Sequence, residues 1–446
     1  MTMYEQMDAL YQKVLGEMEE RIALRKAKGL MPALGYTSNL DMICQATAED
    51  ISRIIRDYLP EGITDPAQFT PPYAVLSLED LALNLFYYTY HGYGSEVMLD
   101  NHHILPGMFP TTEAVGGSAA QATNALAAVG CEALLHYSDG SPAVRKWMEK
   151  DEIKLVTKEG TLTTPADYYE TQEPEQHWIL QFMRGAKVQG KHFSYEIPLS
   201  NRLIVSENVI NRLVLLRQEY LDYVRDHAKN ITSQLISGYN AIRDPENLKD
   251  RTATIAANMR AYHEANPNGV RYLEGGHIVG EGLNDIAMVE LLPVTDLMAT
   301  NEEEIAIVLE HQGIPYDIND IESLIAALRT FRARHGFRLG MLIHSKDYAI
   351  YVGDEVPGDI REGMIYGHAM AAARATYGVP ADVSMVKEML KLPLSPVGVA
   401  YAELIERKRE EYPDVILVPS RLIERPKFTV GLGDTFLGGL QMCFGI

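Results

Sequence analysis

The sequence predicts an α/β fold in which helices cover both faces of a mostly parallel central sheet, giving three layers, with a smaller α+β lobe beside it. One observation is that apolar strand-like runs alternate with helical stretches over residues 205–446, a pattern typical of a doubly wound sheet. A second observation is that this alternation breaks down at 42–111 and 151–204, where clustered prolines and short β-branched runs occur. These two stretches therefore predict an inserted lobe that forms a lid.

The large domain is expected to comprise residues 1–41, 112–150 and 205–446. A helix is predicted at about 4–28, because apolar residues recur there at helical spacing, and a buried strand over 32–36 follows. In the regular part we expect strands at 231–238, 271–274, 294–299, 338–344, 348–352 and 415–418. The helices of this part are expected at 206–230, 243–265, 284–291, 302–312, 318–335 and 361–377.

Residues 111–137 are predicted to form a βαβ unit, with two strands of one sheet joined by a helix. The helix begins at Gly116-Gly117, consists of small residues that permit close packing on a sheet, and ends at Gly130. The two glycines also permit the close approach of a hydroxyl-rich ligand. Tight helix–sheet packing explains the same glycines, and the two interpretations are compatible.

The lid is expected to contain helices at 48–58 and 77–90 and antiparallel strands across 151–205. The adjacent pair His102-His103 is expected in a solvated turn, because neighbouring side chains of an ordinary strand cannot face one metal ion. A set of basic residues in this acidic protein forms either solvated strand faces or a clamp on a phosphate or nucleotide. The set consists of Arg184, Lys187, Lys191 and Arg202.

The composition excludes several classes of function. Lys and Arg number 40 and Asp and Glu number 61, a net charge of −21, which argues against nucleic acid and anionic membranes as partners. An anionic small substrate needs only a local basic cluster and stays possible. The three cysteines form no CxxC pattern, and neither a signal peptide nor a membrane-spanning run is evident. We therefore expect a cytoplasmic protein, and the oligomeric state is not predicted.

Polar residues follow the first predicted strand at Asn39-Leu40-Asp41. The carboxyl end of a strand is where an open α/β sheet places ligand-binding groups, and residues two apart in an extended chain project to the same side. Asn39 and Asp41 can therefore bind two hydroxyls of a polyol. The alternative is an Asx-rich turn that caps the next helix.

The segment Gly431-Leu432-Gly433-Asp434 is predicted to be a tight turn that opens a helix. Glycines two apart present bare N–H groups, and the positive end of the helix dipole adds to them, so that an anion can bind there as its charge develops. Asp434 at the rim can accept a proton from a hydroxyl. Taken alone, this tetrapeptide is equally explained by an ordinary glycine turn.

Acidic residues follow another predicted strand at Asn301-Glu302-Glu303-Glu304. Asn301 with Glu304 matches a helix capping box, whereas carboxylates at a strand end also suit Mg²⁺, which they hold through retained waters. Glu274 ends a neighbouring strand and can share that role. Phosphoryl transfer needs a metal, an anion cradle, a base and positioned hydroxyls, and the sequence offers candidates for all four.

With these motifs, the chain resembles the ribokinase-like superfamily and, within it, the ADP-dependent sugar kinases (glucokinase and phosphofructokinase), over essentially its whole length. The best-matching pieces are 35–41, 116–121, 201–206, Asp296 with Asn301-x-x-Glu304, and 426–436. The resemblance implies a ribokinase-like α/β/α fold with a lid over the sugar, and ADP and a hexose or hexose phosphate as substrates.

The resemblance also implies roles for single residues. Asp434 matches the catalytic base, and Gly431, Leu432 and Gly433 match its anion hole. Glu304, Glu274 and Asp434 match the magnesium-binding carboxylates. The matches to substrate-contacting positions are Asn39, Asp41, Gly116 and Gly117 for the sugar, Glu96 for a sugar hydroxyl in glucose-using members, and Arg202 for a phosphate of the nucleotide or sugar.

The chain departs from the family pattern at two places. Tyr272-Leu273-Glu274 replaces the His-x-Glu found in many members, and Ser118 stands where asparagine is commoner. The predicted function is Mg²⁺-dependent phosphorylation of glucose or fructose 6-phosphate by ADP. An ATP-dependent carbohydrate kinase and a catalytically inactive sugar or nucleotide sensor are the alternatives. Glu96 favours a neutral sugar, and the basic set of the lid favours a phosphorylated one.

Overall fold

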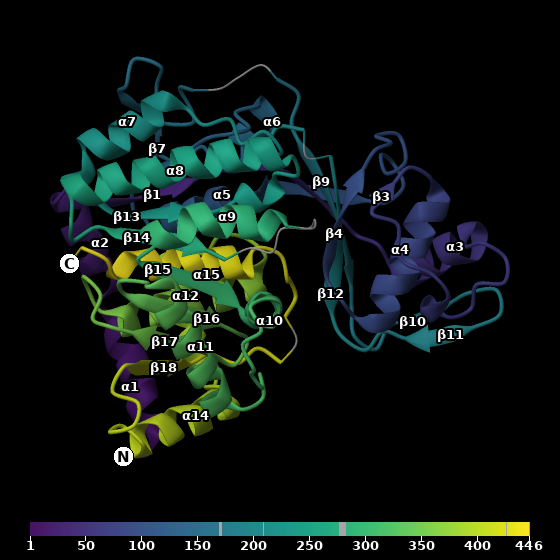
Figure 1. The fold of residues 1–446 in the computed structure, drawn as a ribbon. Coiled ribbons are helices and arrows are strands. Elements are labelled where there is room, and N and C mark those ends of the chain that lie inside the picture. Colours follow the sequence, from purple (N-terminus) through teal and green to yellow (C-terminus); the bar gives the residue numbers. More distant parts are fainter. Residues whose placement is uncertain (169–171, 208, 276–281, 425, 446) are drawn as a thin grey trace.

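The computed structural model describes residues 1–168, 172–207, 209–275, 282–424 and 426–445. Two β-sheets organise these residues into a large domain and a smaller lid, which lie side by side and are joined by the segments that connect strands of one sheet to strands of the other (Figure 1). The large domain carries both chain termini (Figure 1). In the described ranges, no helix combines the length and apolar character that crossing a membrane requires.

The large domain is built on a ten-stranded sheet in the order β18-β17-β16-β15-β14-β13-β1-β6-β7-β8. Pairing is parallel from β16 through β7 and antiparallel at both edges, so the predicted mostly parallel sheet is confirmed. Its strands are β1 (Met31–Gly35), β6 (Ala133–Leu135), β7 (Ile153–Val156), β8 (Leu162–Thr163), β13 (Ile231–Ile236), β14 (Val270–Glu274), β15 (Leu297–Asn301), β16 (Gly340–His344), β17 (Tyr348–Gly353) and β18 (Val415–Pro419).

Helices cover both faces of this sheet, and each face has its own hydrophobic core. One core packs helices against the sheet through residues such as Leu126, Met364 and Leu437. Its helices are α1 (Met3–Gly16), α2 (Met18–Ala27), α5 (Ser118–Ala128), α6 (Pro142–Arg145), α12 (Ile360–Tyr377), α13 (Val383–Glu388) and α15 (Leu432–Leu440). The opposite core involves α7 (Gln218–Asp226), α8 (Pro245–Ala265), α9 (Leu283–Leu291), α10 (Glu302–His311), α11 (Ile321–His335) and α14 (Pro396–Arg407).

The lid is built on a six-stranded sheet in the order β3-β4-β12-β9-β2-β5. Two helices, α3 (Ala48–Tyr58) and α4 (Leu78–His91), cover one face of it, and capping boxes begin both. The strands are β2 (Asn39–Cys44), β3 (Ala74–Val75), β4 (Ser95–Leu99), β5 (Thr111–Gly116), β9 (Gln176–Phe182) and β12 (Asn201–Ser206). A separate hairpin, β10 (Lys187–Gln189) and β11 (Ser194–Glu196), lies at the far end of the lid (Figure 1).

The sheet topology corrects the predicted boundaries between the two domains. The segment 151–163 was expected in the lid, but β7 and β8 extend the large sheet, because Ile153 and Leu155 pack into the core of the large domain. Residues 39–41 were expected in the large domain, but β2 pairs with β5 and β9 in the lid sheet. The division of the chain into these two domains otherwise stays a prediction.

Three further expectations were wrong in detail. The βαβ unit at 111–137 does not form, because β5 belongs to the lid sheet and β6 to the large sheet. The helix expected at 206–230 is confined to α7, since the N–H groups of Ile210 and Asn211 donate to the Glu175 carboxylate instead of to a helical turn. The N-terminal helix is divided at Glu17 into α1 and α2.

Candidate active site

A cavity of about 650 Å³ lies between the lid sheet and the carboxyl ends of the parallel strands of the large sheet. This size is within the range of small-molecule sites, and the position is the one at which open α/β sheets bind ligands. The predicted site residues in its lining are Asn39, Asp41, Glu96, Gly117, Arg202, Glu274, Glu304, Gly431, Leu432, Gly433 and Asp434. The structure thus brings together residues from both domains.

The start of α15 forms one wall of the cavity. Gly431 precedes the helix at φ +70°, and a Cβ atom there would lie 1.8 Å from Oε1 of Gln121, so that both conformation and space require glycine. In the described part of the chain, no side chain caps the first N–H groups of α15. These groups and the helix dipole therefore remain available to an anion.

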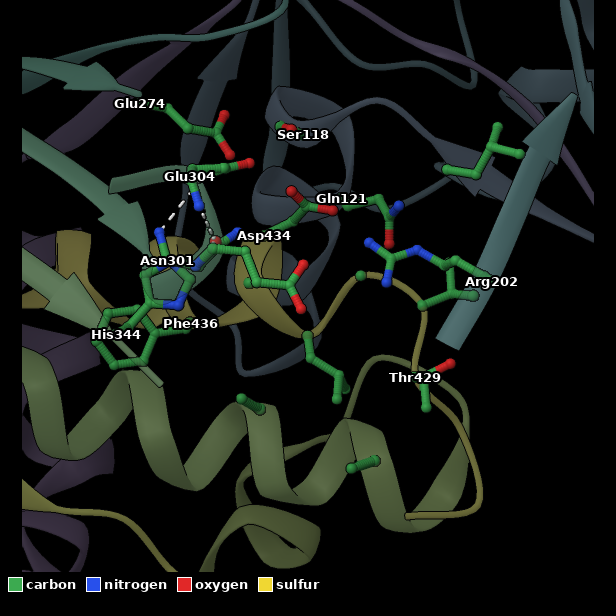
Figure 2. A pocket seen from close by; sticks show the side chains of 18 of the residues that line it. Ser118, Gln121, Arg202, Glu274, Asn301, Glu304, His344, Thr429, Asp434 and Phe436 are labelled. Carbon is green, nitrogen blue, oxygen red and sulfur yellow. Dashed lines mark hydrogen bonds between the residues drawn. The ribbon is translucent and has the colours of Figure 1, made fainter. Parts of the chain in front are cut away.

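Asp434 lies partly buried in the first turn of α15. Burial raises the pKa of its carboxyl group, while a hydrogen bond with Ser118 and the charges of Arg202 and Arg374 oppose this rise. The two arginines therefore favour the ionised form that a base requires. Figure 2 shows Arg202 extending from β12 toward Gln121 and the loop that leads into α15.

The start of α5 forms a second uncapped helix N-terminus at the cavity. Gly117 has φ +88°, and a Cβ atom there would lie 2.5 Å from the carbonyl oxygen of Thr37. No side chain among the described residues caps this helix either. The Ser118 hydroxyl, on the first residue of α5, lowers the pKa values of both Asp434 and Glu274. Serine at this position thus acts on two carboxyl groups of the cavity.

Asn39 and Asp41 lie on β2 and project to the same side of the strand. Nδ2 of Asn39 donates a hydrogen bond of 2.8 Å to Oδ1 of Asp41. Both residues belong to a strand that continues to Cys44, so the alternative of a helix-capping turn is wrong. Gly116 lies behind this pair, because a Cβ atom there would be 2.0 Å from Oδ1 of Asp41 and 2.2 Å from Nδ2 of Asn39.

One face of the lid sheet lines the cavity, and the other packs into the core of the lid. On β9, His177 and Ile179 line the cavity, whereas Trp178 and Leu180 pack toward α3 and α4. This alternation follows from the two-residue period of a strand. Glu96 of β4 lies on the cavity face and accepts a hydrogen bond of 2.7 Å from Oγ of Ser206.

The charges at the lid end of the cavity perturb one another. Burial raises the pKa of Asp41 to about 6, although His177 and Asn39 oppose the change. Burial by itself would lower the pKa of His177, but a hydrogen bond with Glu175 and the negative charges of Glu96, Glu175 and Asp41 outweigh it and raise this pKa to about 9. An imidazolium therefore stands among carboxylates at neutral pH, an arrangement that can bind sugar hydroxyls as both donor and acceptor.

The predicted metal-binding carboxylates lie at the end of β14 and the starts of α10 and α15 (Figure 2). Burial, followed by the negative charges of Asp434 and Glu304, raises the pKa of Glu274 well above its usual value. Burial likewise raises the pKa of Glu304, with Asp434 adding to the effect. A divalent cation would relieve this repulsion, and an all-oxygen donor set suits Mg²⁺.

Direct ligation of one ion by these three acids was not predicted from the sequence, and the described residues do not provide it. The described residues contain no cluster of three or more His, Cys, Asp or Glu side chains that could hold a metal ion. Glu304 also completes a capping box, in which Asn301 accepts hydrogen bonds from the N–H groups of Glu303 and Glu304. That these carboxylates hold a magnesium ion through water molecules, as the sequence predicted, stays a prediction.

Most of the predicted basic clamp lies outside the cavity. Arg184, Lys187 and Lys191 are exposed at the β10–β11 hairpin and its flanks, so the interpretation as solvated surface holds for them. Arg202 is the member of the set that lines the cavity. The histidine pair is also a surface feature: His102 and His103 lie in an exposed turn.

An aromatic group beneath the start of α15 was missed from the sequence. The ring of Phe436 stacks on His344 with centroids 4.8 Å apart and contacts His368 at 5.1 Å. Burial lowers the pKa of His344 to about 4 and that of His368 to about 3, so both rings are neutral and line the cavity as polar but uncharged surfaces. Their position at the end of β16 and within α12 gave no local sequence signal.

Comparisons with known proteins agree with this geometry. The conserved region described as ADP-specific phosphofructokinase/glucokinase matches residues 31–439. An ADP-dependent glucose/glucosamine kinase of Pyrococcus furiosus is 24% identical, with 92% of each chain covered. An ADP-specific phosphofructokinase of Thermococcus kodakarensis is 23% identical, with 94% of this chain and 96% of the relative covered.

Solved structures show the same fold. An ADP-dependent kinase in complex with fructose 6-phosphate and ADPβS superimposes with a TM-score of 0.74 at 21% identity, covering 96% of this chain and 97% of the other. A hypothetical ADP-dependent phosphofructokinase from Pyrococcus horikoshii gives a TM-score of 0.70 at 22% identity, covering 93% and 97%.

Proposed function

The chain belongs to the family of ADP-specific phosphofructokinases and glucokinases, and we propose that it transfers a phosphoryl group from ADP to a primary hydroxyl of a neutral hexose. The observation that carries this proposal is the position of Asp434, at an uncapped helix start, in the same cavity as the polar lid residues Asn39, Asp41 and Glu96. A base, an anion-binding site and hydroxyl-binding groups thus line the same cavity.

Asp434 accepts the proton of the attacking hydroxyl, since its carboxylate lies in the first turn of α15 and lines the cavity. The N–H groups that follow Gly431 stabilise the charge that develops on the transferred group. Arg202 reaches this region from the lid and adds a positive charge. Enclosure by the lid limits the access of water and so limits hydrolysis of ADP.

Glu304 and Glu274, with Asp434 beside them, would hold Mg²⁺, and an ion bound there would neutralise charge on the phosphoryl oxygens. Support comes from the raised pKa values of Glu274 and Glu304. Burial is the main cause of both, and negative charge adds to it, from Asp434 and Glu304 at Glu274 and from Asp434 at Glu304. Glu274 serves without the histidine that commonly precedes it in the family, because Tyr272 occupies that position with its side chain in the core.

The hexose is neutral, because the lid end of the cavity is rich in carboxylates. Glu96 and Asp41 line it, and a sugar phosphate placed beside them would be repelled. The basic residues Arg184, Lys187 and Lys191, which would have balanced such a phosphate, point to solvent. Arg202 remains as a single cation from the predicted clamp, and it lies toward the phosphoryl-transfer side.

A panel of acceptors and donors tests this function. Glucose, glucosamine, fructose 6-phosphate and glucose 6-phosphate are each incubated with Mg²⁺ and either ADP or ATP, and ³¹P NMR identifies the product and the phosphorylated position. We expect glucose with ADP to give the highest kcat/KM. Fructose 6-phosphate as the preferred acceptor would overturn the sugar assignment, and preference for ATP would overturn the donor assignment. Tight sugar binding in calorimetry without any phosphorylated product would indicate a sensor.

We further infer a cytoplasmic location for this enzyme. The three cysteines, Cys44, Cys131 and Cys443, are all buried and free, which supports a reducing compartment. Fractionation of cells that express a tagged chain tests this assignment.

A further inference from the structure

Glu175 is a buried carboxylate at which the connections between the two domains meet. It directly precedes β9, is 2% exposed, and belongs to a segment that brings the chain from the large domain into the lid. Its carbonyl oxygen accepts a hydrogen bond of 2.7 Å from the N–H of Leu40 in β2, the strand that also enters the lid. Its own N–H donates to Oδ2 of Asp139 in the large domain at 2.8 Å.

One carboxylate oxygen of Glu175 holds the chain where it returns from the lid. Oε2 accepts hydrogen bonds from the N–H groups of Ile210 and, at 2.9 Å, Asn211. Asn211 in turn accepts a hydrogen bond of 3.1 Å from Oγ of Ser138, and Oγ of Ser138 lies 2.7 Å from the N–H of Ser38, which donates to it. Three segments that connect the two domains, those that contain Ser38, Glu175 and Asn211, are therefore hydrogen-bonded to one another near this oxygen.

The other oxygen of Glu175 contacts the cavity through a histidine. Oε1 lies 3.3 Å from Nε2 of His177, which lines the cavity two residues further along the chain. In the parallel pairing of β2 with β9, His177 stands opposite Asp41. The charged groups that face this imidazole are Glu175 from its own connection, Asp41 from β2 and Glu96 from β4.

We propose that Glu175 is a positioning residue that holds the His177 imidazole in its donor form toward the hexose and couples hexose binding to the crossings between the domains. Oε1 contacts His177, and Oε2 accepts the hydrogen bonds that hold the chain where it returns from the lid. Both oxygens belong to one carboxylate, so a hexose that binds His177 also stabilises the position of the lid. This inference rests on the proposed function in so far as the ligand at His177 is a hexose.

The substitution Glu175→Gln reverses the polarity of this contact without changing its shape. An amide has one acceptor oxygen, and two backbone N–H groups already require it. The amide NH₂ is then left facing Nε2 of His177, and it can be satisfied only if that nitrogen accepts. The imidazole is thereby forced into its neutral form, with the proton on Nδ1.

Nuclear magnetic resonance of histidine-labelled protein measures the protonation state and the tautomer of His177 directly. The His177 signal is assigned as the one that disappears in His177→Asn, and its titration is followed in the wild type and in Glu175→Gln. We expect a pKa well above the ordinary histidine value of about 6.5 in the wild type, and a neutral, Nδ1-protonated ring at pH 7 in the variant. A wild-type pKa at or below the ordinary value overturns the proposal, even if Glu175→Gln fails to fold.

Kinetics and binding separate a positioning role from a merely structural one. Glu175→Gln is expected to raise the KM for the hexose about tenfold or more, the effect of losing a hydrogen bond to a charged group, and to change the KM for ADP less than twofold. In a His177→Asn background, the same substitution is expected to add less than twofold. Equal losses toward hexose and ADP, or full additivity in the double variant, would show that Glu175 is only structural.

Asp139→Asn provides the matched control. Asp139 is a second buried carboxylate, in the loop between β6 and α6, and accepts the N–H of Glu175, but none of its hydrogen bonds involves His177. We expect it to leave the His177 titration at the wild-type pH, and a shift as large as that of Glu175→Gln would contradict the assignment. If no sugar phosphate forms with ADP, the proposed function is refuted. The role of Glu175 is then still tested by the His177 titration and by calorimetry of hexose binding.

Discussion

The hydroxyl of Thr429 donates a hydrogen bond of 2.9 Å to Oε1 of Gln181 and so joins the loop before α15 to β9 of the lid. The two residues are 248 positions apart in the chain and lie in different domains. Thr429 is two residues before Gly431, where the turn into the anion-binding helix start begins. Closure of the lid and the conformation of the phosphoryl-transfer loop are therefore connected by a single side-chain contact.

Thr429→Val should loosen this connection. A hydrogen bond of this type contributes about 1 kcal/mol, which corresponds to about a fivefold change in the equilibrium between closed and open lid. We expect the KM for the hexose to rise by up to about fivefold, and hydrolysis of ADP without sugar to increase. Thr161→Val, which removes an exposed hydroxyl contact with Thr157 far from the cavity, is the control and should match the wild type. Equal behaviour of the two variants would exclude a role for the Thr429 contact.

Gly116→Ala should weaken sugar binding and leave ADP binding unchanged. The added methyl group would lie within 2.2 Å of both Asp41 and Asn39, and overpacking of this kind costs about 1–3 kcal/mol. We expect kcat/KM for the hexose to fall about tenfold or more, with the KM for ADP unchanged. Gly16→Ala, where no atom lies within 4 Å of the added Cβ, should leave both constants unaltered. A normal hexose KM in Gly116→Ala would contradict the placement of the sugar at this pair.

Sugar binding should depend on pH through Asp41. Its pKa is raised by burial to about 6, so the carboxylate is ionised above this pH and protonated below it. As the pH falls through about 6, Asp41 loses acceptor capacity, and the KM for the hexose should rise. The pH profile of kcat/KM for the hexose, compared with that for ADP at saturating hexose, measures this. A hexose KM that stays constant from pH 7.5 to 5 would show that Asp41 does not bind the sugar.

Arg374→Met should move that pH profile. Arg374 is a buried residue of α12 whose positive charge lowers the pKa values of both Asp41 and Asp434. Without this charge both carboxylates hold their protons more strongly, so the acidic limb of kcat/KM should shift to higher pH. Arg374→Lys retains the charge and should restore the wild-type limb. A shift to lower pH, or equal shifts in both variants, would contradict this electrostatic role.

Local chemistry in the sequence predicted the parts of the site that depend on neighbouring residues. The two-residue spacing of Asn39 and Asp41, the capping box of Asn301 with Glu304, and the glycine turn at Gly431 each specify a conformation within a few positions. The structure brings all three to one cavity. The family resemblance supplied the roles, which spacing by itself could not assign.

Features set by distant parts of the chain could not be predicted in this way. Nothing local in β5 or β7 indicates which sheet each strand joins, because pairing partners lie far away in sequence. The segment at Ile210 has helical composition but gives its N–H groups to Glu175. His177 was missed because the apolar run of Trp178, Ile179 and Leu180 in β9 does not alternate with polar residues. The cavity-facing side of the strand is defined only by the packing of Trp178 into the lid core.

Asp434→Asn should separate binding from chemistry. The amide preserves the size of the side chain and its place at the start of α15 but cannot accept the proton of the attacking hydroxyl. We expect calorimetry to show hexose and ADP binding within a few-fold of the wild type, and kcat to fall by at least about 10²-fold, the usual contribution of a general base. Asp41→Asn offers the contrast, because loss of a sugar-binding carboxylate should weaken hexose binding more than it lowers kcat at saturation. Near-normal turnover of Asp434→Asn at saturating substrates would remove Asp434 from the role of base, and the base would then have to be sought among the other carboxylates that line the cavity, such as Glu274 and Glu304.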